Sequence, residues 1–211
     1  MKQHVILLHG LARSSRSMNY LSRTLIRSGF SVDNCSYPSQ KLSIEMLSEK
    51  VFDQLIQRIP NCDKVHFVTH SLGGILLRYY LSQHEIPKLG RVVMLAPPNQ
   101  GSEVVDRLKH WPMFRWFNGP AGQQLGTDAS GIPHHLPDAN FELGIIAGSR
   151  SINYYLSTLL PKPNDGKVSV ESTKLAGMSA HLILPVSHSF IMRNRQVCHQ
   201  TIQFLQYGKF I

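Results

Sequence analysis

The chain has 211 residues, of which 42% are hydrophobic and 17% are charged, and its formal net charge is +9 at pH 7. This length and apolar content predict one domain over residues 1–211 and argue against two small domains. The Lys and Arg residues are scattered, which favours plain solubility over nucleic-acid binding but allows weak peripheral contact with an anionic membrane. Composition leaves the oligomeric state open.

The N-terminal and cysteine patterns are typical of a cytoplasmic protein. The opening stretch "MKQHVILLHG" lacks a basic region followed by a small-residue cleavage site, and no run reaches the ~20 apolar residues that span a bilayer. Cys35, Cys62 and Cys198 have no metal-like spacing, which argues against a disulfide framework and against a zinc cluster. We therefore expect a cytoplasmic chain without a bound metal.

Strand and helix patterns alternate along the chain, which predicts an α/β fold: a mostly parallel sheet of about six strands with helices on both faces. The expected strands are residues 4–10, 30–38, 64–70, 91–98, 141–149 and 180–188, and the expected helices are 17–28, 44–58, 72–84 and 190–207. Residues 97–140 break the rhythm, because they are rich in Pro, Gly, Trp and Phe and exceed an ordinary connection. We expect this segment to be an insertion or lid-like element over a site.

The stretch "KVHFVTHSLGGILLRYY", residues 64–80, changes from an apolar β-branched run to helical spacing at "THSLGG". A strand-to-helix turn this tight strains its central residue, Ser71, and exposes the side chain above the sheet. Gly73 lets the backbone pass close by, and the helix start directs its amides toward negative charge near the serine oxygen. Ser71 is therefore predicted to be a nucleophile, although serine is also a common helix N-cap.

With "HG" after the first strand and "HSLGG" at this turn, nearly the whole chain resembles the α/β-hydrolase family, specifically its small bacterial-type lipases and esterases. The resemblance implies a cofactor-independent serine hydrolase whose elbow serine attacks an ester carbonyl. It also implies a triad in the chain order Ser, Asp, His, so that the acid and the base lie downstream of Ser71. The chain departs from the common pattern at Thr69, where Gly is usual.

Topology selects His188 as the base among the eleven histidines. Catalytic groups of open α/β sheets gather beyond the carboxyl ends of the strands, and His188 follows the last strand. It would take the Ser71 proton and return it to the leaving group. His70 is expected to point away from Ser71. The other histidines considered lie at the opposite strand edge, on the last helix or in the insertion: His181, His199, His134 and His135.

A neutral imidazole needs a carboxylate to fix its tautomer, and the loop "PNDGKVSV" before the last strand offers Asp165. Asn-Asp-Gly is also ordinary turn chemistry, in which Asp bonds its own backbone. The lipases that the chain resembles carry their acid in such a D-G-x-V loop, which supports Asp165. Asp138 and Glu142 are the alternatives.

Two backbone N–H groups are needed where the charge of a tetrahedral intermediate appears, a contribution of ~3 kcal/mol per donor in other hydrolases. Leu72 supplies one by following the nucleophile, and the resemblance points to the Leu11 amide in "HGLARSS" for the other. Gly10 would allow close approach, and His9 is expected to order this loop. The stretch "RSSRS" fits an anion site, but a helix start capped by Ser is favoured.

The insertion concentrates aromatic residues in "HWPMFRWF". Trp111, Phe114, Trp116 and Phe117 either wall an apolar acyl site or pack the insertion onto the body. We therefore expect a carboxylic ester hydrolase of lipid metabolism that acts on a small-molecule or lipid ester through an acyl-enzyme on Ser71. An acyltransferase or thioesterase would use the same residues, whereas a non-catalytic lipid- or protein-binding module would be expected to carry a broken triad.

Overall fold

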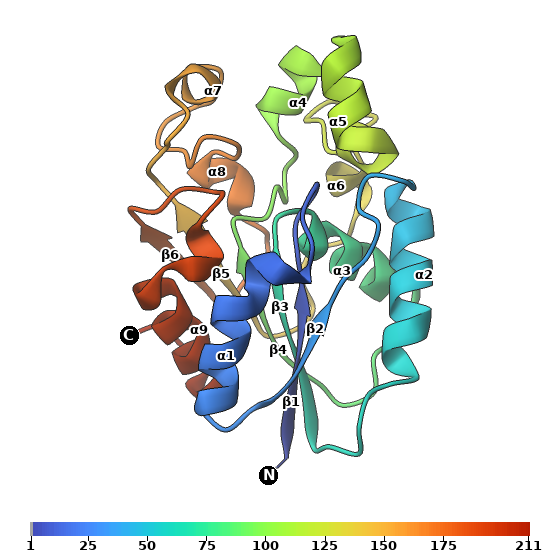
Figure 1. The fold of residues 1–211 in the computed structure, drawn as a ribbon, viewed down its shortest axis with the longest axis vertical. Coiled ribbons are helices and arrows are strands. Elements are labelled where there is room, and N and C mark those ends of the chain that lie inside the picture. Colours follow the sequence, from blue (N-terminus) through green and yellow to red (C-terminus); the bar gives the residue numbers. More distant parts are fainter. Residues whose placement is uncertain (1) are drawn as a thin grey trace.

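The computed structural model describes residues 2–211, apart from the Arg115 side chain, and has a central sheet between helical layers (Figure 1). Among these residues the sheet has six parallel strands in the order β2-β1-β3-β4-β5-β6. The strands are β1 (Gln3–Leu8), β2 (Ser31–Cys35), β3 (Lys64–His70), β4 (Leu89–Leu95), β5 (Leu143–Gly148) and β6 (Ala180–Leu184). The α/β fold predicted from the sequence is confirmed.

Helices cover both faces of the sheet, because side chains of successive strand residues point to opposite faces and both sets are apolar. On β1, Ile6 and Leu8 belong to one buried cluster, and Val5 and Leu7 belong to the other. The first cluster includes α2 (Ile44–Ile56) and α3 (Leu72–Gln83), and the second includes α1 (Asn19–Arg27) and α9 (Arg195–Tyr207). None of the described helices has the length and apolarity needed to cross a bilayer.

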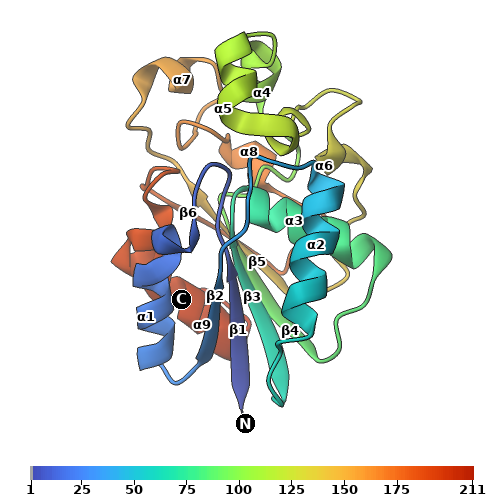
Figure 2. The ribbon, with the colours of Figure 1, turned by 45° about the vertical axis from the view of Figure 1, so that its right-hand side comes forward.

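The long connections lie at the carboxyl ends of the strands, where Figure 2 shows α4, α5 and α7 above the sheet. Residues 97–140 form three helices, where the sequence analysis expected an insertion without assigning helices: α4 (Glu103–Leu108), α5 (Pro112–Gln123) and α6 (Ile132–His135). Between β5 and β6 the chain forms α7 (Tyr154–Thr158) and α8 (Val170–Thr173). The sequence analysis did not predict these two helices, because five and four residues are too few to show a helical period.

A buried arginine ties the 97–140 segment to α3. Arg78 is 3% exposed, and its guanidinium donates to the carbonyl of Asn99 at 3.0 Å and to that of Leu136 at 3.1 Å. Burial lowers the pKa of Arg78 to about 10, which leaves the group charged at neutral pH. A buried charge that bonds carbonyls near both ends of the segment holds those ends against the body.

The first helix begins differently from the expectation. The 3₁₀ helix η1 (Ser15–Met18) precedes α1, and a second one, η2 (Ile191–Arg193), precedes α9. Ser14 occupies the N-cap position of η1, but its side chain forms no capping hydrogen bond. Instead the hydroxyl of Ser17 donates to the Ser14 carbonyl at 2.7 Å. The "RSSRS" stretch therefore lacks the serine cap favoured from the sequence.

Candidate active site

Ser71 lies in the turn between β3 and α3, with φ +50° and ψ −120°. Such a backbone conformation costs a non-glycine residue roughly 1–3 kcal/mol. Two hydrogen bonds hold it: the Ser71 N–H donates to the Leu95 carbonyl at 3.0 Å, and the Gly74 N–H donates to the Ser71 carbonyl at 2.9 Å. This strained strand-to-helix turn is the geometry that presents a serine hydroxyl as a nucleophile.

Two glycines allow the loop after β1 to pack against this turn. A Cβ atom on Gly73 would lie 2.8 Å from the Leu8 carbonyl oxygen, closer than real side chains come. A Cβ atom on Gly10 would lie 2.7 Å from Nδ1 of His70 and 3.2 Å from Cβ of Ser71. The loop that contains the predicted second oxyanion donor therefore touches the Ser71 turn directly.

His188 and Asp165 come from different loops and form a buried pair. His188 follows β6 and is 5% exposed, and Asp165, between α7 and α8, is 2% exposed. Nδ1 of His188 and Oδ2 of Asp165 are 2.8 Å apart. Because a carboxylate only accepts hydrogen bonds, the ring proton is on Nδ1 and Nε2 is left as the basic nitrogen. The structure thus brings together the base and the acid that the sequence analysis selected.

The turn itself satisfies the other oxygen of Asp165. Oδ1 accepts hydrogen bonds from the N–H groups of Lys167 at 3.0 Å and Val168 at 2.8 Å. Asn164 Oδ1 accepts from the N–H of Gly166, which has φ +94°. The Asn-Asp-Gly sequence therefore forms a hydrogen-bonded turn, and its Asp165 also bonds His188. The turn interpretation and the histidine-partner interpretation are compatible.

The alternative acids lie elsewhere. Glu142 pairs with Nε of Arg91 at 2.6 Å, just before β5 and thus at the amino end of the sheet. The negative charge of Asp138 acts on Arg78 and partly offsets the lowering of its pKa by burial. Neither carboxylate bonds His188 among the residues that the structure describes.

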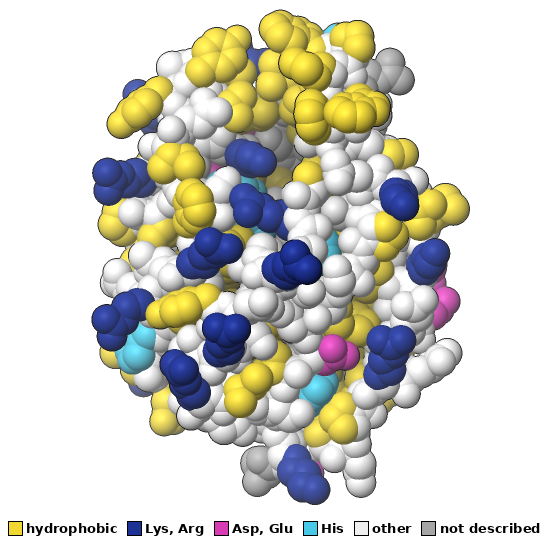
Figure 3. Space-filling model, in the orientation of Figure 1, with side chains coloured by type: hydrophobic (Ala, Val, Ile, Leu, Met, Phe, Trp, Pro, Cys, Tyr) yellow, Lys and Arg dark blue, Asp and Glu magenta, His cyan; other side chains and the backbone are white. Residues whose placement is uncertain are grey.

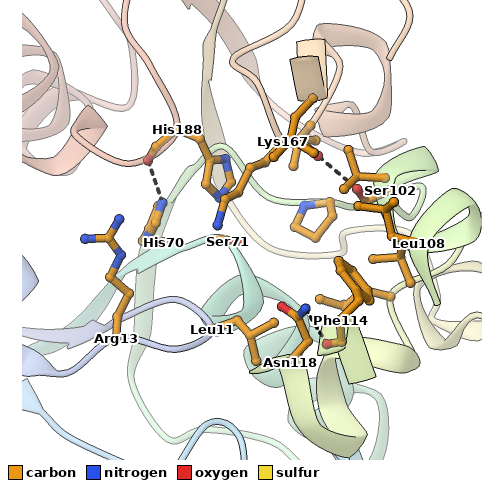
Figure 4. A pocket seen from close by; sticks show the side chains of 16 residues that line it. Leu11, Arg13, His70, Ser71, Ser102, Leu108, Phe114, Asn118, Lys167 and His188 are labelled. Atoms are coloured by element: carbon orange, nitrogen blue, oxygen red, sulfur yellow. Dashed lines mark hydrogen bonds between the residues drawn. The ribbon is translucent and has the colours of Figure 1, made fainter. Parts of the chain in front are cut away.

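A cavity of about 220 Å³ opens beside Ser71 and His188 (Figure 4). Leu11 lines it, and Leu72 begins α3, where the first amides of a helix have no partner within the helix. Of the two residues predicted to supply oxyanion-hole N–H groups, Leu11 lines the cavity and Leu72 is the buried residue that follows Ser71, and their role as donors stays a prediction. The 97–140 segment contributes an apolar wall: Val104, Val105, Leu108, Phe114 and Leu125.

The four aromatic residues predicted for an acyl site fall into two groups. Phe114 lines the cavity, whereas Trp111, Trp116 and Phe117 are 57%, 77% and 53% exposed and are not among the residues that line it. Figure 3 shows hydrophobic side chains gathered on this end of the molecule, over α5 and α7. Contact with substrate stays a prediction for all four rings, and only Phe114 has a position at the cavity to support it.

His70 makes a contact that the sequence analysis missed. Its Nε2 donates to the His188 carbonyl at 3.1 Å, and the two rings are 4.9 Å apart. Burial holds the pKa of His70 well below its usual value, and the nearby His188, Arg13 and Lys167 lower it further. The bond spans 118 residues of sequence, so no local pattern could indicate it.

His9 holds the loop after β1. Its ring stacks on Tyr37 with centroids 4.0 Å apart, Nδ1 donates to the Gly10 carbonyl at 2.8 Å and Nε2 accepts from the Tyr37 N–H at 3.2 Å. Burial lowers the pKa of His9, which favours the neutral ring that this bonding requires. These contacts agree with the interpretation that His9 orders the loop.

No sequence-family model matches the chain, and a comparison with curated protein sequences found no match. Solved structures do resemble it. The mature lipase BlEst2 of Bacillus licheniformis is 18% identical, with a TM-score of 0.74 over 99% of this chain and 93% of that one. The phospholipase PlaB from Legionella pneumophila is 18% identical, with a TM-score of 0.75 over 99% of this chain and 60% of that one. A metagenomic carboxyl esterase, MGS0156, is 16% identical, with a TM-score of 0.70 over 88% and 64% of the two chains.

These similarities define the class of structure. The neighbours are lipases and esterases, and the likeness extends over nearly the whole chain. The chain therefore has the α/β-hydrolase fold, as the resemblance in its sequence implied. Identities below one fifth establish the fold alone, so the chemistry has to be argued from the site.

Proposed function

We propose that this protein is a cofactor-independent serine hydrolase that cleaves carboxylic esters through an acyl-enzyme on Ser71. The observation that carries the proposal is the buried His188–Asp165 pair beside the strained Ser71, with Ser71 and His188 lining one cavity. The lipases and esterases among the structural neighbours support the same class of reaction.

The proposed reaction has two halves. The Ser71 hydroxyl attacks the ester carbonyl while Nε2 of His188 takes its proton, and the N–H groups of Leu11 and Leu72 stabilise the oxyanion. The protonated His188 then gives that proton to the departing alcohol, which leaves an acyl group on Ser71. Water, activated by His188 in the same way, releases the acid. Asp165 stays ionised and stabilises the imidazolium.

The acyl group would lie against the apolar wall from the 97–140 segment, which gives that segment its lid-like role within one hydrolase domain. Small-molecule and lipid esters with apolar acyl chains are the substrates that such a wall favours, because each buried methylene contributes up to ~0.8 kcal/mol. Acyl transfer and thioester cleavage would use the same residues. Adding an alcohol acceptor to the ester assay tests acyl transfer, and replacing the ester by a thioester tests thioester cleavage.

A fluorophosphonate probe tests the nucleophile, because it reacts only with a serine that a neighbouring base activates. We expect one covalent adduct, found by mass spectrometry on the peptide that contains Ser71 and lost in Ser71→Ala. Ser102 is the matched control: it also lines the cavity, but its hydroxyl donates to the Lys167 carbonyl at 2.8 Å. Ser102→Ala should still be labelled. An unlabelled folded protein, or an adduct on Ser102, would contradict the proposal.

A further inference from the structure

Two cationic side chains line the cavity with Ser71 and His188: Arg13, from the loop after β1, and Lys167, from the turn that contains Asp165. Figure 4 shows Arg13 on the side of the cavity away from Leu108 in the apolar wall. The cavity therefore combines an apolar wall with two cationic residues, and Ser71 and His188 line it with them.

Neither cation forms an ion pair with a carboxylate within residues 2–211. Asp165 is the carboxylate whose charge acts on Lys167, but its oxygens already accept hydrogen bonds from His188 and from two backbone N–H groups. Lys167 is exposed to solvent, but desolvation by the surrounding loops still lowers its pKa, and the Arg13 guanidinium lowers it too. The two positive charges are near enough to act on each other, and Arg13 is partly exposed and Lys167 exposed, so an anion from solution can reach both and reduce their repulsion.

The loops hold the backbone of both cations in place. The Lys167 N–H donates to Asp165 Oδ1 at 3.0 Å, and the Lys167 carbonyl accepts from the Ser102 hydroxyl at 2.8 Å. Arg13 follows Ala12, which has φ +53° and donates its N–H to the Ser39 hydroxyl at 3.0 Å. The loops that contain the proposed acid and oxyanion donor thus also place the cations, which sit in a concavity rather than on the convex surface.

We propose that Arg13 and Lys167 bind an anionic oxyacid group of the substrate, with the apolar wall taking its acyl chain. The preferred substrate class is then an amphiphilic ester with a phosphate or carboxylate on the alcohol side of the scissile bond. The planar guanidinium fork and the point-like ammonium together match the oxygens of such a group. The inference rests on the proposed function for the bond that is cleaved, whereas the anion site is tested independently of it.

Binding tests the anion site without catalysis. Hexyl phosphate, heptanoate and hexanol share a short apolar chain and differ in the polar end, and calorimetry gives their dissociation constants for the intact protein. We expect hexyl phosphate or heptanoate to bind about tenfold or more tightly than hexanol, with an advantage that shrinks as salt is added. Whichever anion binds more tightly identifies the oxyacid. Equal affinity of all three would overturn the inference.

Substitutions assign the preference to these two side chains. Arg13→Gln with Lys167→Gln should reduce the preference for the anion about tenfold, whereas Lys167→Arg, which keeps the charge, should retain it. Lys2→Gln with Lys64→Gln is the matched control, because it also removes two positive charges and both lysines are exposed at the amino end of the sheet. If the double variant still prefers the anion as strongly as the native protein does, the assignment to Arg13 and Lys167 is overturned. If that variant fails to fold, the salt dependence of anion binding by the native protein decides whether a cationic site exists.

Hydrolysis separates this inference from the proposed function. We compare hexanoyl esters of glycerol 3-phosphate, of lactate and of glycerol, and expect kcat/KM to favour an anionic ester about tenfold, chiefly through KM. Hydrolysis of all three at equal kcat/KM would overturn the substrate preference and leave the hydrolase standing. Tight binding of hexyl phosphate by a protein that cleaves no ester would support the anion site and contradict the proposed function.

Discussion

The two ends of the parallel sheet both contain buried histidines, but the histidines have different surroundings. At the amino end, Nδ1 of His66 accepts a hydrogen bond from the Arg91 N–H at 2.8 Å, and Arg91 pairs with Glu142. At the carboxyl end, His188 borders a cavity beside the strained Ser71.

The difference teaches which features mark a reactive site. His66 is 2% exposed and His188 is 5% exposed, so burial does not distinguish them. A strained serine, a carboxylate bonded to an imidazole and an open cavity come together at the carboxyl end of the sheet, where ligands of open α/β folds bind. We therefore expect substitutions at the carboxyl end to change activity and substitutions at the amino end to change stability.

The largest expected effect is that of Asp165→Asn. Asparagine can keep an oxygen toward the N–H groups of Lys167 and Val168, but it then presents an amide N–H to Nδ1 of His188 and favours the wrong tautomer. We expect kcat for ester hydrolysis to fall about 10³–10⁴-fold, with a melting temperature close to that of the native protein.

Glu142→Gln is the control at the amino end. It removes one carboxylate from a partly exposed ion pair, so we expect near-native kcat and a loss of about 0.2–1 kcal/mol in the free energy of unfolding. Near-normal turnover in Asp165→Asn together with a large loss in Glu142→Gln would reverse the comparison and move the acid to Glu142.

A smaller effect on substrate preference should distinguish an aromatic residue that lines the cavity from an exposed one that does not. Phe114 lines the cavity and Trp116 is 77% exposed. Phe114→Ala should lower the ratio of kcat/KM for hexanoate over acetate esters about tenfold, because the longer chain loses apolar contact that the shorter one never makes. Trp116→Ala should change this ratio less than about twofold.

The ratio cancels any general loss of active protein, so a destabilised variant can still be interpreted. Equal losses for both esters in Phe114→Ala would mean that this ring only packs α5. A large selective loss in Trp116→Ala would show that the exposed aromatic residues reach the substrate, as the sequence analysis considered.

Local signals explain what could be predicted. The period-2 and period-3.6 hydrophobic patterns predicted the strands and the helices that pack on the sheet. Ser71, followed closely by Gly73 and Gly74, indicated a strained turn, because the residues that such a turn needs lie within a few positions of one another. The position of His188 after the last strand, with the chain order that the family resemblance implied, then selected this histidine, and the resemblance of the D-G-x-V loop supported Asp165. The structure places the two side chains 2.8 Å apart.

Features that depend on tertiary packing could not be predicted. The direction in which each ring of α5 points depends on how the helix lies on the body, so Phe114 could not be distinguished from Trp116 by sequence. Arg13 and Lys167 lie in different loops far apart in the chain, and only the fold brings both to one cavity. The "RSSRS" stretch contains Arg13 and did suggest an anion site, but the sequence analysis favoured a serine-capped helix start there.

The smallest expected effect is at the amino end and concerns stability against pH. Burial, together with the nearby positive charge of Arg91, lowers the pKa of His66 to about 4, against 6.5 for an ordinary histidine. The unfolded chain therefore binds a proton here between pH 6.5 and 4 that the folded chain does not bind. Stability is full above this window and falls as the pH falls through it. The shift corresponds to at most about 2 kcal/mol between pH 7 and 5, and to about 1 kcal/mol after allowing for solvent screening.

His66→Gln should remove this contribution, because glutamine can accept from the Arg91 N–H but does not titrate. Urea unfolding at pH 7 and at pH 5 gives the free energy of unfolding that is lost between the two pH values. We expect this loss to be smaller in His66→Gln than in the native protein by about 1 kcal/mol. Ester hydrolysis at pH 7 should be unaffected. His199→Gln, which changes an exposed histidine on α9, should leave the native loss unchanged. If His66→Gln loses as much stability as the native protein, the acid sensitivity belongs to His4, His9, His70 or His181, whose pKa values burial also lowers. His70 precedes Ser71, and His9 orders the loop that packs against the Ser71 turn. If either of these two is responsible, activity and stability should fall together in acid, and pH would not separate the two ends of the sheet.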